Sequence, residues 1–156
     1  MRRVLTDSDV ILDLFVAREP HHTIALHFFS HLEVERDGIA ASASPVALAN
    51  VAYVLAKLKD KAYAVGKLRE LRTLIGVSPI DQSAVDRALA RPHREFEDAL
   101  QRECALDNEI DILVTRNTRD HPKDTIQILT PVDVMRLHST EQDRQQLSRP
   151  VDRCPP

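Results

Sequence analysis

Short runs of bulky apolar residues alternate along the chain with longer stretches in which apolar residues recur every three or four positions. The short runs are as rich in bulky apolar residues as buried β-strands are, and they cover residues 2–6, 39–42, 77–80, 110–115 and 126–130. The third of them, 77–80, is only a brief extended segment. The stretches between them have helical spacing and cover residues 10–16, 21–37, 44–58, 60–75, 81–89, 95–108 and 131–137. Strands separated by helices predict parallel β-α units with helices on both faces of the sheet. We therefore expect an α/β fold, a three-layer α/β/α sandwich around a central parallel sheet.

The apolar pattern stops after His138. Residues 139–156 are polar and include three prolines, so they offer few apolar side chains to a packed core. A chain of 156 residues has the usual size of one domain. The sequence thus predicts one domain at residues 1–138 and a disordered tail at 139–156.

Composition excludes several function classes. Only 3 glycines are present and they stand apart, so the sequence has no glycine-rich phosphate loop, dinucleotide-binding turn or serine-hydrolase elbow. The formal net charge of −3 excludes a generally basic nucleic-acid coat, but it is compatible with a local basic patch. Two cysteines make neither a disulfide framework nor a zinc site, and they suit a reducing compartment. No apolar run approaches the roughly 20 residues of a membrane span, so we expect a soluble cytoplasmic protein without membrane contact.

Polar residues directly follow the predicted strands, at the edge where parallel α/β sheets bind ligands. They are Asp7 and Asp9 after the first strand, Ser42 and Ser44 after the second, and Thr115, Arg116, Asn117 and Asp120 after the fourth. Asp98 lies near the start of a helix, between apolar residues. Carboxylates gathered on one rim repel each other unless a cation neutralises them, and such oxygen ligands suit Mg²⁺ or Mn²⁺. The purely structural interpretation is that Asp7 and Asp98 cap helix N-termini, where an acid contributes about 0.3–1 kcal/mol.

Four short segments resemble, in the same order, the sequence blocks of PIN-domain ribonucleases. The segments are 4–13, 42–44 with 50–55, 95–101 and 115–120, so the resemblance covers about residues 1–137. The branch that they resemble most is that of the toxin components of toxin–antitoxin pairs. The resemblance implies a Mg²⁺- or Mn²⁺-dependent endoribonuclease that cleaves single-stranded RNA by activating water. The expected partners are the RNA substrate, an antitoxin protein and a second copy of the chain.

The same resemblance assigns roles to individual residues. Asp7 and Asp98 match metal-binding acids of the family. Asn50 and Asn117 stand where many members carry Glu and Asp, and an Asn offers a metal a carbonyl oxygen but no charge. Other acids after the strands can return that charge. The predicted catalytic residues are Asp7, Asp98, Asn117 and Asp120, and the predicted metal ligands are Asp7, Asp9, Asn50 and Asp98. The residues expected to contact RNA are Arg116, Arg119, Lys123 and Ser44.

Two other functions fit parts of the pattern. Asn50 and Asn117 are compatible with a PIN-fold binding module whose weakened acid set no longer holds metal. The order Asp7-Ser8-Asp9 also fits the Asp-x-Asp opening of haloacid-dehalogenase-like phosphatases, in which the first Asp is the nucleophile.

Some candidate side chains have structural alternatives. His27, His31 and Glu35 have the spacing of zinc ligands on one helix, but histidines on the surface of an amphipathic helix have the same pattern. Ser44 before a proline is typical of a helix N-cap. Cys104 is typical of a small buried apolar residue.

Overall fold

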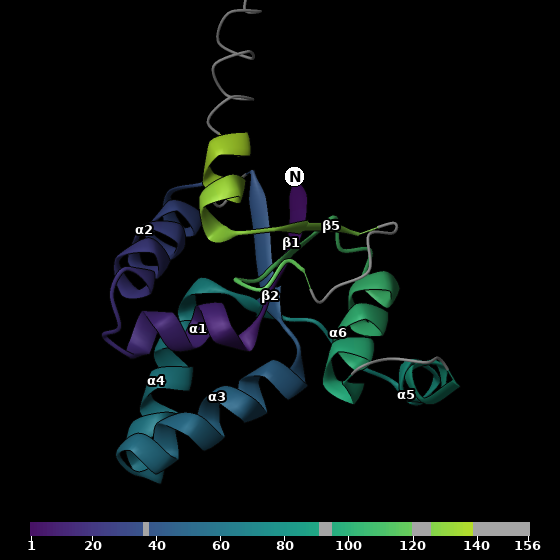
Figure 1. Ribbon diagram of the computed structural model, residues 1–156, viewed down its shortest axis with the longest axis horizontal. Helices are drawn as coiled ribbons and strands as arrows, with labels where there is room; N and C mark the ends of the chain where they lie inside the picture. The colour runs from purple at the N-terminus through teal and green to yellow at the C-terminus, as the bar shows by residue number, and fades with distance from the viewer. Residues whose placement is uncertain (36–37, 91–94, 120–125, 139–156) are drawn as a thin grey trace, which may run out of the picture.

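A five-stranded parallel sheet forms the centre of the molecule. The computed structural model describes residues 1–35, 38–90, 95–119 and 126–138. The strands are β1 (Arg2–Thr6), β2 (Ile39–Ala43), β3 (Gly76–Val77), β4 (Ile112–Val114) and β5 (Gln127–Leu129). Their order in the sheet is β3-β2-β1-β4-β5, and every neighbouring pair is parallel. Figure 1 shows the sheet between the helices, with β1, β2 and β5 labelled. The predicted parallel sheet is confirmed, although the third strand lies at Gly76–Val77 rather than at 77–80.

The strand order fixes the place of a ligand site. The chain runs outward from β1 through β2 to β3, and then crosses back to place β4 on the other side of β1. The carboxyl ends of β1 and β4 therefore lie side by side where the order reverses, which is the usual ligand site of such sheets. In the register, Thr6 of β1 is opposite Val114 of β4, so the residues that follow these two strands are neighbours.

Helices cover both faces of the sheet. They are α1 (Ser8–Phe15), α2 (His21–Val34), α3 (Pro45–Leu58), α4 (Lys61–Leu74), α5 (Gln82–Ala90), α6 (Phe96–Asp107) and a helix at 131–138. Successive residues of β1 point to opposite faces. Val4 packs in the larger core with α1–α4 and the helix at 131–138, whereas Leu5 packs in the smaller core with α6. Helix α5 lies against α6 (Figure 1). The predicted three-layer sandwich is confirmed.

Capping residues explain where several helices begin. The Ser44 hydroxyl accepts a hydrogen bond from the Ala47 N–H at 3.1 Å, and Asp60 does the same for the Tyr63 N–H at 2.7 Å. Ser44 is fully buried, and its expected N-cap role is confirmed.

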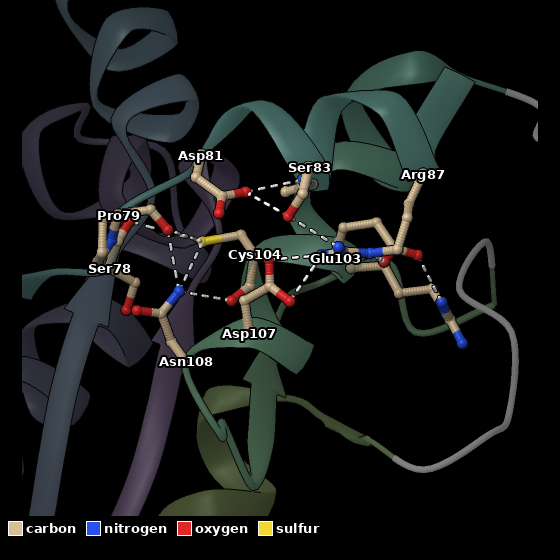
Figure 2. A network of polar contacts seen from close by, with 11 residues as sticks. Ser78, Pro79, Asp81, Ser83, Arg87, Glu103, Cys104, Asp107 and Asn108 are labelled. Carbon is tan, nitrogen blue, oxygen red and sulfur yellow. Dashed lines mark hydrogen bonds and ion pairs between the residues drawn. The ribbon is translucent and has the colours of Figure 1, made fainter. Parts of the chain in front are cut away.

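The described part of the chain settles other expectations. Cys104 is fully buried in the smaller core, and burial raises the pKa of its thiol to about 11, so its core role is confirmed. Figure 2 shows its sulfur beside Ser78 and Pro79. Among the described helices, none has the length and apolar character needed to cross a bilayer. The predicted tail at 139–156 lies outside the described residues.

Candidate functional site

Asp7 joins the ends of the two central strands. It follows β1 directly, and its backbone N–H donates to the Val114 carbonyl of β4 at 2.9 Å. Its Oδ1 accepts from the Ser8 N–H at 2.6 Å, which caps α1. Its Oδ2 accepts from the Thr115 hydroxyl at 2.9 Å. The capping role is therefore confirmed, and the same carboxylate also faces the residue that follows β4.

Asp9 lies in the first turn of α1, beside the same segment. Its Oδ2 accepts from the backbone N–H of Arg116 at 3.0 Å, and it lies 3.3 Å from the Nε of that residue. The Thr115 hydroxyl is 3.4 Å from the same oxygen. The other oxygen, Oδ1, is buried and has no hydrogen-bond partner within the described ranges. Asp9 therefore has one carboxylate oxygen whose hydrogen-bonding capacity is unused.

Asp13 is a third acid of this group, and the sequence analysis missed it. Its carboxylate is 3.3 Å from the Nε of Arg116, and its side chain is only 4% exposed. Burial raises the pKa of Asp13, and the positive charge of Arg116 partly opposes that rise. The sequence spacing could have predicted this position, because Asp13 follows Asp9 by four residues and therefore lies on the same face of α1. We call Asp7, Asp9, Asp13, Thr115 and Arg116 the strand-end group.

A second contact joins α3 to the first turn of α6. The side-chain amide of Asn50 donates to the carboxylate of Glu97. Burial raises the pKa of Glu97, and the neighbouring charge of Asp98 raises it further. The predicted ligand Asn50 therefore lies next to a carboxylate that the sequence analysis did not select. Glu97 could have been selected from the sequence, because it directly precedes Asp98 in the segment 95–101 that resembles the family.

Comparisons with known proteins place the chain in a family. A family model described as a PIN domain matches residues 3–119. The chain belongs to the PIN-domain family. No curated protein matches the chain significantly.

Several solved structures have a similar fold. VapC20 from Mycobacterium tuberculosis, a toxin that cleaves the sarcin–ricin loop, is 16% identical, with a TM-score of 0.57 over 70% of this chain and 86% of that chain. A toxin–antitoxin complex from Klebsiella pneumoniae is 20% identical, with a TM-score of 0.60 over 82% and 97%. DNA-bound VapBC from Salmonella typhimurium is 17% identical, with a TM-score of 0.61 over 84% and 99%. At these identities the likeness shows that the PIN domain has the fold of VapC structures.

The remaining predicted site residues of the PIN domain differ in their surroundings. Arg116, Asn117 and Arg119 are exposed, and the Asn117 N–H donates to the Thr115 hydroxyl at 3.2 Å. Ser44 has no exposed surface with which to contact RNA, because its hydroxyl faces the start of α3. The other two predicted residues, Asp120 and Lys123, lie outside the described residues.

The acidic side chains that are present limit how a metal ion could be held. Within the ranges that the structure describes, no three His, Cys, Asp or Glu side chains form a group that could hold a metal ion. The zinc alternative on α2 therefore has no support, and the ring of His31 instead packs edge-on against that of His138, with 5.3 Å between centroids. Asp7 and Asp9 are brought together through Thr115. Two carboxylates with one unused oxygen fit Mg²⁺, which commonly takes one or two protein carboxylates and completes its shell with water and substrate phosphate.

Proposed function

We propose that this PIN-domain protein is a metal-dependent endoribonuclease that cleaves single-stranded RNA, and that it is the toxin of a toxin–antitoxin pair. The observation that carries the proposal is the strand-end group, in which two aspartates after β1 meet a threonine and an arginine after β4 at the switch point of a PIN domain. The fold likeness to VapC20, a toxin that cleaves an RNA loop, supports the same reaction class.

The proposed cofactor is Mg²⁺ or Mn²⁺, held first by Asp7 and Asp9. The unpartnered Oδ1 of Asp9 supports this choice, because a buried carboxylate oxygen without a donor is favourable only when a cation or water reaches it. When bound there, such a cation would supply charge that polarises the phosphodiester and would lower the pKa of a water molecule. We also propose that Asp98 and Asn50 contribute ligands, with Glu97 supplying negative charge beside Asn50.

The side chains around the aspartates would position the RNA. The Thr115 hydroxyl donates to Asp7 at 2.9 Å and the next residue's backbone N–H donates to Asp9 at 3.0 Å, so consecutive residues after β4 hold the two carboxylates. Arg116 and Arg119 are exposed and would bind phosphate oxygens, for which a guanidinium has a suitable shape. Asn117 and Asp120, together with Lys123, belong to the same proposed RNA-facing segment.

The proposed partners follow from the structural neighbours. The Klebsiella pneumoniae structure is a toxin–antitoxin complex and the Salmonella typhimurium one is a DNA-bound VapBC. By this likeness we propose an antitoxin protein as partner, a homodimer as the toxin's own assembly, and the cytoplasm as its location.

Cleavage of a fluorescent, unstructured RNA oligonucleotide tests the activity. We expect cleavage with Mn²⁺ and none after chelation with EDTA. Asp7→Asn and Asp98→Asn should each lower the rate by at least about 100-fold, because each removes charge from the metal site and keeps the side-chain volume. Asp107→Asn, an acid on α6 outside the strand-end group, is the matched control and should cleave as fast as wild type. Cleavage that survives EDTA or Asp7→Asn would contradict the proposal.

A second function is favoured by the lack of any three-ligand acidic group in the described residues. In that case the protein is a PIN-fold binding module. It would bind the oligonucleotide without cleaving it, and Asn50→Glu, which restores the acid of the family, would not create activity. A phosphatase would instead release phosphate from a small phosphomonoester through Asp7.

A further inference from the structure

A cavity of about 210 Å³ lies next to the strand-end group. It is bounded by α1, α2, the segment after β4 and the start of the helix at 131–138. Most of its wall is apolar and comes from Val10, Ile24, Ala25, Pro131 and Val132. Typical sites for drug-sized ligands begin near about 300 Å³, so this cavity has room for one small planar group.

Asp13 and Arg116 are the oppositely charged side chains in the cavity wall, which also contains His21 and Thr130. The side chain of Asp13 is 4% exposed. The carboxylate of Asp13 lies 3.3 Å from the Nε of Arg116, and the charges of His21 and Arg18 also act on it. Within the described residues the terminal nitrogens of Arg116 have no hydrogen-bond partner. The cavity therefore has a carboxylate acceptor and a guanidinium donor in a mostly apolar wall, to which His21 and Thr130 add further polar groups.

The cavity is adjacent to the proposed catalytic aspartates. The same Nε of Arg116 lies 3.3 Å from the carboxylate of Asp9 and 3.3 Å from that of Asp13. The guanidinium of Arg116 thus lies between Asp9, which is proposed to hold the metal ion at the phosphate, and Asp13, which lines the cavity. A nucleotide could place its phosphate on one side of Arg116 and its base on the other.

We propose that this cavity binds one nucleobase of the RNA substrate and prefers guanine. The inference rests on the proposed ribonuclease function. Guanine alone among the four bases presents two adjacent donors, N1–H and N2–H, which match the carboxylate of Asp13. Its O6 accepts from Arg116, and the apolar walls contact the faces of the ring. Adenine, cytosine and uracil each place an acceptor where guanine has a donor, so a carboxylate disfavours them.

Base preference in cleavage tests the proposal. The substrates are matched oligonucleotides with a single G, or with A, C or U at the same position, moved stepwise along an otherwise constant sequence. We expect wild type to cleave next to G about tenfold faster or more. Asp13→Asn should remove that preference, since an amide can turn either a donor or an acceptor toward the base. Val132→Phe fills the cavity without touching a charge and should lower cleavage at G to the level of the other bases. Asp86→Asn, an exposed acid on α5, is the control.

Binding of guanosine monophosphate separates this inference from the proposed function, because it needs no cleavage. Isothermal titration should show tighter binding of guanosine than of adenosine monophosphate to wild type, and no difference in Asp13→Asn or Val132→Phe. Cleavage without base preference would overturn the base site and leave the ribonuclease standing. Selective binding of guanosine monophosphate without cleavage would support the base site and overturn the ribonuclease. If Asp13→Asn and Val132→Phe both keep the wild-type selectivity for guanosine monophosphate, the base binds outside this cavity and the proposal is wrong.

Discussion

Two acidic groups, one at the carboxyl ends of β1 and β4 and one between α5 and α6, differ in how fully their charges are compensated. One is the α5–α6 network, made of Ser83, Arg87, Glu103 and Asp107, which Figure 2 labels, together with Arg102. In it the Oε2 of Glu103 lies 2.8 Å from Arg87, its Oε1 lies 2.9 Å from Arg102, and its side chain is 2% exposed. Arg87 also donates to Asp107 at 2.6 Å and to Ser83 at 2.9 Å. The other is the strand-end group, in which Arg116 faces two aspartates through a single nitrogen.

The difference separates a structural role from a functional one. In the α5–α6 network each carboxylate oxygen of Glu103 has its own arginine, so a ligand would have to break existing bonds. In the strand-end group, Oδ1 of Asp9 is buried and has no hydrogen-bond partner in the described residues. Burial also disfavours the charged form of Asp13 and so raises its pKa. Unused hydrogen-bonding capacity and perturbed carboxylates are typical of sites that await a ligand.

The largest expected effect on stability is in the α5–α6 network. Glu103→Gln keeps the shape but loses charge-assisted hydrogen bonds to two arginines, so it should lower the free energy of unfolding by about 2 kcal/mol. Glu109→Gln changes a pair whose acid is 81% exposed and should stay within about 0.5 kcal/mol of wild type. Urea-induced unfolding at pH 7, followed by circular dichroism, measures both. Equal midpoints for the two variants would show that the network adds nothing to stability.

Divalent ions should stabilise the folded protein by binding at the strand-end group and not at the α5–α6 network. At ten times its dissociation constant, Mn²⁺ should add about 1.4 kcal/mol, which raises the melting temperature by about 3–6 °C. Asp7→Asn should lose this rise, and because Asn is also a good N-cap, it should otherwise start α1 normally. Glu103→Gln should keep the full rise relative to its own melting temperature without metal. A rise of equal size in Asp7→Asn would place the ion elsewhere in the protein.

Local patterns predicted the sheet and the position of Asp7. Strand–helix alternation is written in neighbouring residues, and the carboxyl ends of parallel strands share an edge, so Asp7 and Thr115 could be expected to meet before the fold was known. The pairing of Asp13 with Arg116 could not, because it depends on β4 lying beside β1, a contact between residues about a hundred positions apart in the sequence. Asp13 itself was hidden in an apolar run that indicates a buried helix.

The same limit applies to the other side chains. Glu97 contacts Asn50 only because α6 packs near α3, and a one-residue difference from Asp98 on a helix changes the direction of the side chain by about 100°. Ser44 was expected both to cap a helix and to contact RNA, and full burial leaves it only the first role in the described structure. Pattern thus located the edge of the sheet, whereas tertiary packing selected which acids face one another.

The smallest expected effect comes from neutralising Asp13, the counterpart of Glu103 in the strand-end group. Burial is the largest influence on its pKa, ahead of the attraction of Arg116, so the charged form is disfavoured in the folded state. Asp13→Asn removes that cost and leaves Arg116, which is 37% exposed, in contact with water. At pH 7 it should therefore be as stable as wild type or more stable by up to about 1 kcal/mol, opposite in sign to Glu103→Gln.

The pH dependence of the stability difference between Asp13→Asn and wild type shows whether burial or the ion pair with Arg116 dominates. The folded-state pKa of Asp13 is raised above its unfolded value, so wild type binds this proton more strongly when folded and loses stability as the pH rises from the unfolded toward the folded pKa. The charged groups that act on Asp13 are Arg116, His21, Asp9 and Arg18. Asp13→Asn and wild type should then unfold alike in urea near pH 3.5 and separate as the pH approaches 7, with the variant more stable. A variant that is less stable at pH 7, by a margin that grows with pH, would show that the ion pair with Arg116 outweighs burial. The strand-end group would then resemble the α5–α6 network.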